Sequence, residues 1–180
     1  MPSVPFTVAA LAAALLLTAC DSGGAGEGDA GGDGGGRTTR AAAAACAADG
    51  IAVEVGPANA APVAGDTGNL PVTLTNEGSE CILDGFPVVK FSAGGEKVAV
   101  PVDEAAKAQK LTLAEGAAAS FTLTYVRGEE GAAGSLAVEA LEIALPGAAE
   151  GGSHPWSYGP VAGGEAAPEA SVGAFQQAGD

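Results

Sequence analysis

The sequence is poor in the side chains that metal centres and large hydrophobic cores require. Histidine, methionine and tryptophan occur once each, and aromatic residues make up 4% of the 180 residues. Because the only methionine is Met1, copper carriage through methionine ligands is excluded. Although 47% of the residues are apolar, 42 of the residues are alanines, so the chain has material for one small domain at most.

Basic residues are scarce as well. The chain has 7 Lys and Arg residues against 22 Asp and Glu residues, which gives a formal net charge of −15. The acidic residues are spread along the chain rather than gathered in one segment. A negative surface repels phosphate backbones, so we expect no nucleic-acid partner.

The N-terminal residues are typical of an export signal. Residues 6–17 are apolar except for Thr7, and this run is shorter than the roughly 20 residues with which a helix crosses a bilayer. We therefore predict a signal peptide over residues 1–19. Cys20 completes the sequence Leu-Thr-Ala-Cys, which resembles the lipobox of bacterial lipoproteins. The resemblance implies that Cys20 becomes the mature N-terminal residue and carries a lipid.

A lipid on Cys20 would anchor the protein to the membrane. No second apolar run of spanning length is present, so we expect the lipid to be the sole anchor, on the outer face of the cytoplasmic membrane. The alternative is an ordinary signal peptide that is cleaved elsewhere, with Cys20 as an incidental thiol. Residues 20–45 are expected to form a flexible linker, since residues 22–36 contain nine glycines and offer no apolar surface.

The remaining two cysteines predict a disulfide. Cys46 and Cys81 form an even pair in an exported protein, where disulfides persist. The alternative is two buried free thiols. With these cysteines paired, the single histidine cannot complete a zinc site, which takes about three or four ligands. The acidic residues between positions 77 and 84 lack the spacing of a calcium loop, so we expect no metal and no cofactor.

Beyond Cys46, apolar residues alternate with polar ones between turn residues, which indicates short strands. Gly94 and Gly95 suit a tight hairpin, and Pro71 favours an edge position or a bulge for its strand. Residues 46–146 are therefore predicted to form an all-β, immunoglobulin-like antiparallel β-sandwich of about seven strands. Residues 147–180 return to Gly, Ala and Pro, and this segment either docks a last strand or frays. The expected strands cover residues 51–55, 70–75, 88–91, 98–102, 111–113, 121–126 and, as one or two strands, 136–145.

Few residues in the sequence are candidates for a site. Trp156 and Tyr158 flank one serine and form a candidate binding patch, because aromatic anchors concentrate in recognition surfaces. The alternative is that Trp156 fills the core of a domain with few large side chains. His154 is interpreted as a solvated loop residue, since no G-x-S-x-G nucleophile elbow accompanies it. Neighbouring carboxylates such as Glu129 and Glu130 point apart on a strand or turn, so we predict no catalytic residue.

Several segments in fixed order carry a family resemblance. Cys46 opens the domain, residues 74–78 are Leu-Thr-Asn-Glu-Gly, residues 81–88 are Cys-Ile-Leu-Asp-Gly-Phe-Pro-Val, and residues 111–116 are Leu-Thr-Leu-Ala-Glu-Gly. Together they resemble a family of secreted and lipid-anchored actinobacterial proteins with the domain of unknown function 4232, over about residues 46–145. The resemblance implies a location and a fold but no activity. Many relatives carry a second cysteine pair that this chain lacks, which implies less firmly tied last strands.

These observations predict a membrane-anchored extracytoplasmic lipoprotein with a non-catalytic β-sandwich. We expect the sandwich to bind an unidentified envelope protein or glycan through loops or an exposed sheet edge. Two alternatives from other classes stay open. One is a carboxylate-based hydrolase of the cell envelope, and the other is a purely structural surface spacer.

Overall fold

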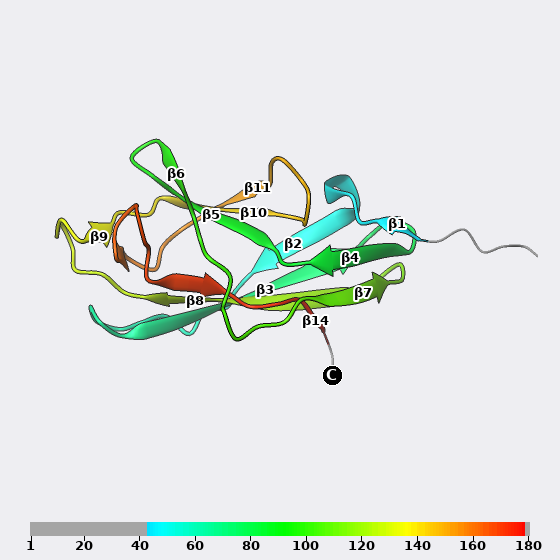
Figure 1. Ribbon diagram of the computed structural model, residues 1–180, viewed down its shortest axis with the longest axis horizontal. Coiled ribbons are helices and arrows are strands. Elements are labelled where there is room, and N and C mark those ends of the chain that lie inside the picture. Colours follow the sequence, from blue (N-terminus) through cyan, green and yellow to red (C-terminus); the bar gives the residue numbers. More distant parts are fainter. Residues whose placement is uncertain (1–42, 179–180) are drawn as a thin grey trace, which may run out of the picture. The chain divides into compact units, whose positions relative to one another are not determined.

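Residues 43–178 are described by the computed structural model, in which short turns connect the strands (Figure 1). This part of the chain contains fourteen strands and one short 3-10 turn, η1 (Ala48–Gly50). The predicted signal peptide, Cys20 and most of the predicted linker lie outside the described residues. Within residues 43–178, no helix has the length and apolar character that crossing a bilayer requires.

One layer of the fold is a five-stranded antiparallel sheet. Its strands in spatial order are β13 (Ala170–Val172), β8 (Ala118–Val126), β3 (Thr67–Asn76) and β2 (Ile51–Val55), and β14 (Gln176–Gln177) also pairs with β8. The β3–β8 pair is the centre of this sheet and joins nine residues of each strand. Long antiparallel pairing of this kind agrees with the predicted sandwich.

The other strands form three smaller sheets. The largest has four antiparallel strands, β11 (Gly152–Pro155), β10 (Ala140–Ala144), β5 (Val88–Ala93) and β6 (Glu96–Ala99). A second contains β1 (Ala44–Ala45), β4 (Cys81–Gly85) and β7 (Gln109–Leu113), with β1 parallel to β4. The third pairs β12 (Val161–Ala162) with β9 (Ser135–Leu136). In Figure 1, β5, β10 and β11 lie together above the layer of β3 and β8.

Inward side chains from both layers meet in one hydrophobic core. Leu70, Val72 and Leu74 of β3 are fully buried, and so is Phe91 of β5. Burial alternates residue by residue along β3 and β8, as the period of a half-buried strand requires. The predicted all-β sandwich is therefore confirmed.

The predicted glycine hairpin is also confirmed. β5 and β6 are joined by Gly94 and Gly95, whose φ angles are +57° and +87°. Two consecutive residues with positive φ define the turn whose twist matches that of the flanking strands, and glycine adopts this conformation without steric cost.

Pro71 lies in a central strand, so the predicted edge position is wrong. β3 has β8 on one side and β2 on the other. Strand pairing with β2 ends at Val55 opposite Val72, and the carbonyl of Pro71 then accepts a hydrogen bond from Gly56 N–H at 2.8 Å. The backbone polar groups of Pro71 therefore point to the β2 side of β3, just beyond the last residue of β2. A proline is tolerated there because its missing N–H affects only the last bond of that ladder.

The C-terminal segment docks on the sandwich, so the fold extends past the predicted boundary at residue 146. β13 and β14 both pair with β8, and Phe175 between them is fully buried. The ring of Phe175 meets that of Phe121 edge-on, with 5.7 Å between centroids. Val161 and Val172 are also fully buried. A few large apolar residues thus anchor a segment whose overall composition resembles a linker.

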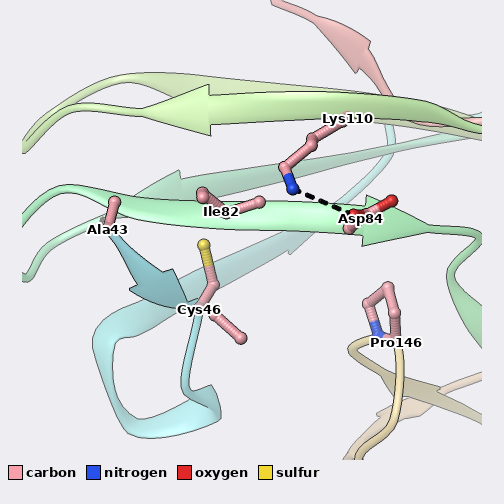
Figure 2. A pocket seen from close by; sticks show the side chains of 7 residues that line it. Ala43, Cys46, Ile82, Asp84, Lys110 and Pro146 are labelled. Carbon is pink, nitrogen blue, oxygen red and sulfur yellow. Dashed lines mark ion pairs between the residues drawn. The ribbon is translucent and has the colours of Figure 1, made fainter.

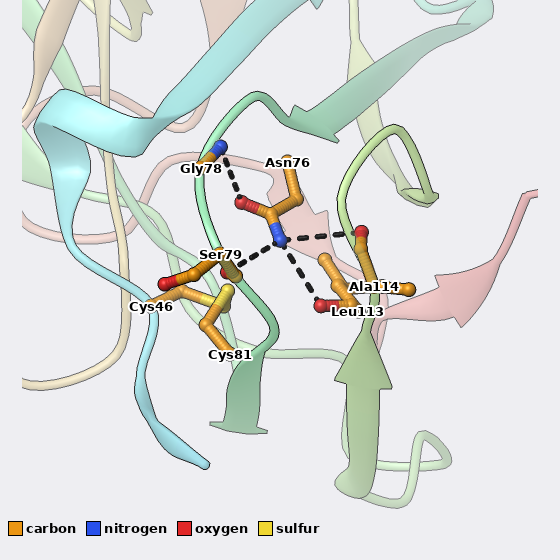
Figure 3. Close-up of a disulfide and its surroundings, with 7 residues drawn as sticks. All are labelled: Cys46, Asn76, Gly78, Ser79, Cys81, Leu113 and Ala114. Atoms are coloured by element: carbon orange, nitrogen blue, oxygen red, sulfur yellow. Dashed lines mark hydrogen bonds between the residues drawn. A yellow bond between two sulfur atoms is a disulfide. The ribbon is translucent and has the colours of Figure 1, made fainter.

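The predicted disulfide is present between Cys46 and Cys81 (Figure 3). It joins the segment that leads into η1 to the first residue of β4, and the backbone N–H of Cys46 also donates to Ile82 O at 3.0 Å. Since the cysteines are 35 positions apart, the covalent link ties the N-terminal end of the described chain to an internal strand. The alternative of two free thiols is excluded.

Asn76 holds the turn that precedes β4 (Figure 3). Its side chain is buried, and its amide nitrogen donates to the carbonyls of Ser79, Leu113 and Ala114 at 2.9, 3.0 and 3.2 Å. Its Oδ1 accepts from Gly78 N–H at 3.0 Å. One side chain therefore connects the end of β3 to the end of β7.

Candidate functional site

The strongest candidate site is a cleft between two edge strands, which we call the β2–β11 cleft. Among the described residues, β2 pairs only with β3 and β11 pairs only with β10, so each layer ends here in a strand with one open side. The space between them measures about 230 Å³. It is lined by Ala48, by Ile51 and Val53 of β2, by residues 143–145 at the end of β10, by Glu150 and Gly151, and by Gly152 and His154 of β11.

The strand register explains why these side chains face the cleft. Along β2, Ile51 and Val53 lie two residues apart and share the inner face of the sheet. Along β11, His154 is opposite Leu141 and Gly152 is opposite Ile143, and these β10 partners are core residues. Directly paired residues lie on the same face of a sheet. His154 therefore points between the two layers, toward β2.

The backbone of β2 also offers unpaired polar groups to the cleft. Glu77 N–H donates to Gly50 O and Gly56 N–H donates to Pro71 O, both in the β2–β3 register. Because alternate residues bond the partner strand in an antiparallel pair, residues 52 and 54 also face β3. The N–H and C=O groups of Val53 consequently point away from β3, along the open side of β2.

His154 is not the solvated loop residue that the sequence suggested. It lies within β11, and its Nε2 is buried without a hydrogen-bond partner among the described residues. Gly152 leaves room for the ring, since a Cβ at that position would lie 3.4 Å from Nε2. A buried polar atom without a partner costs about 1–3 kcal/mol. A ligand that supplies a hydrogen bond to Nε2 would remove this cost.

The charge of the cleft is negative. Glu150 lines it, and no Lys or Arg of the described chain does. Residues 43–178 contain seventeen acidic and five basic residues. Most of these bases are engaged elsewhere, because Lys90 and Lys97 pair with Glu142 and Arg127 donates to two backbone carbonyls.

A second hollow, of about 240 Å³, lies beside β4 (Figure 2). It is lined by alanines of the β1 segment, Cys46, Ile82 and Pro146, together with Asp84 and Lys110. Lys110 Nζ lies 3.3 Å from Asp84 Oδ2, so the two charged side chains of this hollow form an ion pair with each other. Asp84 and its exposed neighbours form no metal site, and no group of three or more candidate metal ligands is found within residues 43–178. This hollow is therefore the weaker candidate.

The aromatic pair Trp156 and Tyr158 packs inside the fold. The Trp156 ring lies 5.2 Å from that of Phe91, 5.0 Å from that of Tyr125 and 4.9 Å from that of Tyr158, with all three contacts edge-on. Only 8% of Trp156 is exposed, and its Nε1 donates to Gly159 O at 2.6 Å. This placement agrees with the core-filling alternative. A binding role for the pair stays a prediction.

The residues of the cleft were mostly missed by sequence reasoning. Ile51 and Val53 were predicted as a strand, but no local pattern shows that this strand ends a sheet. A period-two pattern through Gly152, His154 and Trp156 is the signal that could have placed His154 on the inner face.

Comparison with known proteins identifies a protein family but no activity. Residues 46–176 match the model of a family described as "Domain of unknown function (DUF4232)". The match extends past the C-terminal limit expected from the sequence motifs, in agreement with the docked strands. Searches of curated proteins and of solved structures found no match.

Proposed function

Since the chain belongs to the DUF4232 family, whose description names no activity, we propose a function from its own residues. The protein is a membrane-anchored extracytoplasmic lipoprotein of the secreted and lipid-anchored actinobacterial type. A lipid on Cys20 is the anchor, and the glycine-rich residues between Cys20 and β1 are the stalk, which ends before the predicted limit at Ala45 because Ala44 and Ala45 pair with β4. The β-sandwich is a non-catalytic module that binds another component of the cell envelope at the β2–β11 cleft.

The location is supported by the sequence and by the disulfide. The Leu-Thr-Ala-Cys sequence at Cys20 follows an apolar run of signal-peptide length. Disulfides form and persist in oxidising compartments outside the cytoplasm, and the Cys46–Cys81 bridge is of this structural kind.

Binding rather than catalysis is supported by one observation, the apolar cleft with a buried and unpartnered imidazole nitrogen. A histidine that acts as a general base is oriented by a third group and lies within hydrogen-bond reach of a nucleophile. His154 Nε2 has no such neighbour in the described structure. Aliphatic walls with a few polar groups suit recognition of a mostly apolar group.

The test is crosslinking on intact cells followed by purification of the protein under denaturing conditions. Ala48 is exposed and lines the cleft, so Ala48→Trp would fill its mouth with little cost to the fold. Ala47 is its exposed neighbour outside the lining, so Ala47→Trp is the matched control. We expect a defined partner with the wild type and with Ala47→Trp, and at least a tenfold loss with Ala48→Trp. Equal recovery from both variants would contradict the proposed site.

A further inference from the structure

We propose that the β2–β11 cleft receives an extended, basic segment of another polypeptide, which adds a strand to the open side of β2. This inference rests on the proposed function and names the chemistry of its partner. The segment would place one or two apolar side chains in the cleft, hydrogen-bond its backbone to Val53, and direct its positive charges toward Glu150.

The size and lining of the cleft favour part of a polypeptide as the ligand, rather than a small molecule or a glycan. Its volume of about 230 Å³ is below the roughly 300–1,000 Å³ of typical small-molecule sites. A space of this size takes one or two side chains of a larger partner. A glycan would bring hydroxyl groups against Ile51, Val53 and Ile143, where they would lose hydrogen bonds to water without replacement.

The edge of β2 is suited to pairing. Exposed edge strands invite a further strand unless prolines, bulges or charged side chains protect them. β2 spans five residues, and Glu54 is its only charged residue. By contrast, the edge strand β6 carries Glu96 and Lys97, and β11 ends in Pro155. Strand addition to such an open edge is a recurring mode of peptide recognition, in which main-chain hydrogen bonds supply affinity.

The charge of the domain selects a basic segment. Glu150 lines the cleft, Asp49 is exposed on η1 next to the lining residue Ala48, and Glu54 is exposed on β2. The excess of twelve acidic over basic residues in the described chain adds a long-range field of the same sign. Such a field speeds the approach of cations and disfavours acidic partners. A second copy of this chain carries the same acidic surface and is disfavoured for that reason.

His154 would position the segment. His154 lines the cleft on the side opposite β2, and its buried Nε2, which lies next to Gly152, lacks a hydrogen-bond partner in the described structure. A strand paired to β2 has backbone or side-chain groups directed to its other side, within the same cleft. A hydrogen bond from such a group to Nε2 would satisfy this atom. The two walls of the cleft would then contact one segment.

The test uses the full chain in detergent with three synthetic heptapeptides, one alternating Lys and Val, one alternating Glu and Val, and a Lys-Val peptide with a central proline. Amide hydrogen exchange reports on the N–H of Val53, and fluorescence anisotropy of labelled peptides reports affinity. We expect the Lys-Val peptide to slow exchange at Val53 at least tenfold. We expect the Glu-Val and proline peptides to bind at least tenfold more weakly.

Two variants and one control locate the site. Val53→Pro removes an N–H that points away from β3, and we expect it to weaken peptide binding at least tenfold. Ala99→Pro makes the same change at an exposed, outward-pointing position of β6, and it should leave binding unchanged. His154→Phe keeps a ring but removes Nε2, and about a fivefold loss is expected. If Val53→Pro fails to fold, His154→Phe still tests whether the peptide binds in the cleft.

Several outcomes would refute strand addition. The first is that the Lys-Val peptide does not bind at millimolar concentration, and the second is that the acidic peptide binds equally well. The third is that a folded Val53→Pro or His154→Phe variant binds the Lys-Val peptide as tightly as the wild type. If sedimentation shows a dimer that the Val53→Pro variant does not form, the partner of β2 is a second copy of this chain and the proposed basic segment is wrong. One combination of results separates the two proposals. If Ala48→Trp removes a crosslinked partner on cells, but the peptides leave the hydrogen-exchange rate of Val53 N–H unchanged, the proposed function stands and strand addition fails.

Discussion

Replacing Asn76 by alanine is expected to lower the free energy of unfolding by about 3–4 kcal/mol. The side chain is only 1% exposed and makes four polar contacts, three through its amide nitrogen and one through Oδ1. The nitrogen carries two hydrogens, so these contacts amount to about three full hydrogen bonds at roughly 1 kcal/mol each. Alanine also leaves buried carbonyls such as Leu113 O without this donor, which adds to the loss.

The assay is urea unfolding at neutral pH, followed by the fluorescence of the buried Trp156. Asn59→Ala is the matched control, because Asn59 is exposed, and we expect it to change the unfolding free energy by less than about 0.5 kcal/mol. A loss below about 1 kcal/mol for Asn76→Ala would refute the argument that this side chain holds the turn.

Asn76→Asp separates hydrogen bonding from packing, since it keeps the shape and removes the donors. An ionised carboxylate would face three carbonyl oxygens in a buried site, so its pKa in the folded state lies above that in the unfolded chain. The folded state then binds more protons between these two values, and the unfolding free energy of the variant must increase as pH falls through that window. A pH-independent difference from the wild type would contradict this reasoning.

Three further predictions concern the disulfide, the C-terminal segment and the anchor. Cys81→Ser opens a link between positions 35 residues apart and should lower the unfolding free energy by about 4 kcal/mol. Urea unfolding of the reduced wild type should give the same loss, and an unchanged midpoint in both samples would contradict it. Phe175→Ala should cost about 3–5 kcal/mol and increase hydrogen exchange in β13 and β14, whereas a neutral result would mean that the segment does not anchor there. Cys20→Ala should move the protein from the membrane fraction to the medium, and retention in the membrane would argue against the lipid.

The regular strands could be predicted from sequence because their side-chain pattern is local. Ile51, Val53 and Val55 alternate with smaller or polar residues, and the predicted strand has the bounds of β2. The glycine pair after β5 was equally clear, since two residues with positive φ leave few other choices. In these places the backbone conformation and the burial pattern are both encoded within a few residues.

Other features depend on which strands become neighbours, and local patterns do not contain that information. No strand was predicted over residues 81–85, yet Cys81–Gly85 forms β4 between β1 and β7. Pro71 was expected at an edge or at a bulge because a proline usually weakens a ladder, whereas its strand is central and β2 ends before reaching it. The β2–β11 cleft exists because both layers end at the same side of the sandwich. This topological fact brings Val53 and His154 to one space although 101 positions separate them in the sequence.

The most direct test of the binding role is photo-crosslinking from single positions on living cells. Ala48 is exposed and lines the cleft, and Thr122 is exposed on the outer face of β8, so a photoreactive residue at each position compares the two surfaces in one fold. We predict that position 48 captures one defined polypeptide and that position 122 does not. Capture of the same polypeptide from position 122 alone, or equally from both positions, would contradict the account.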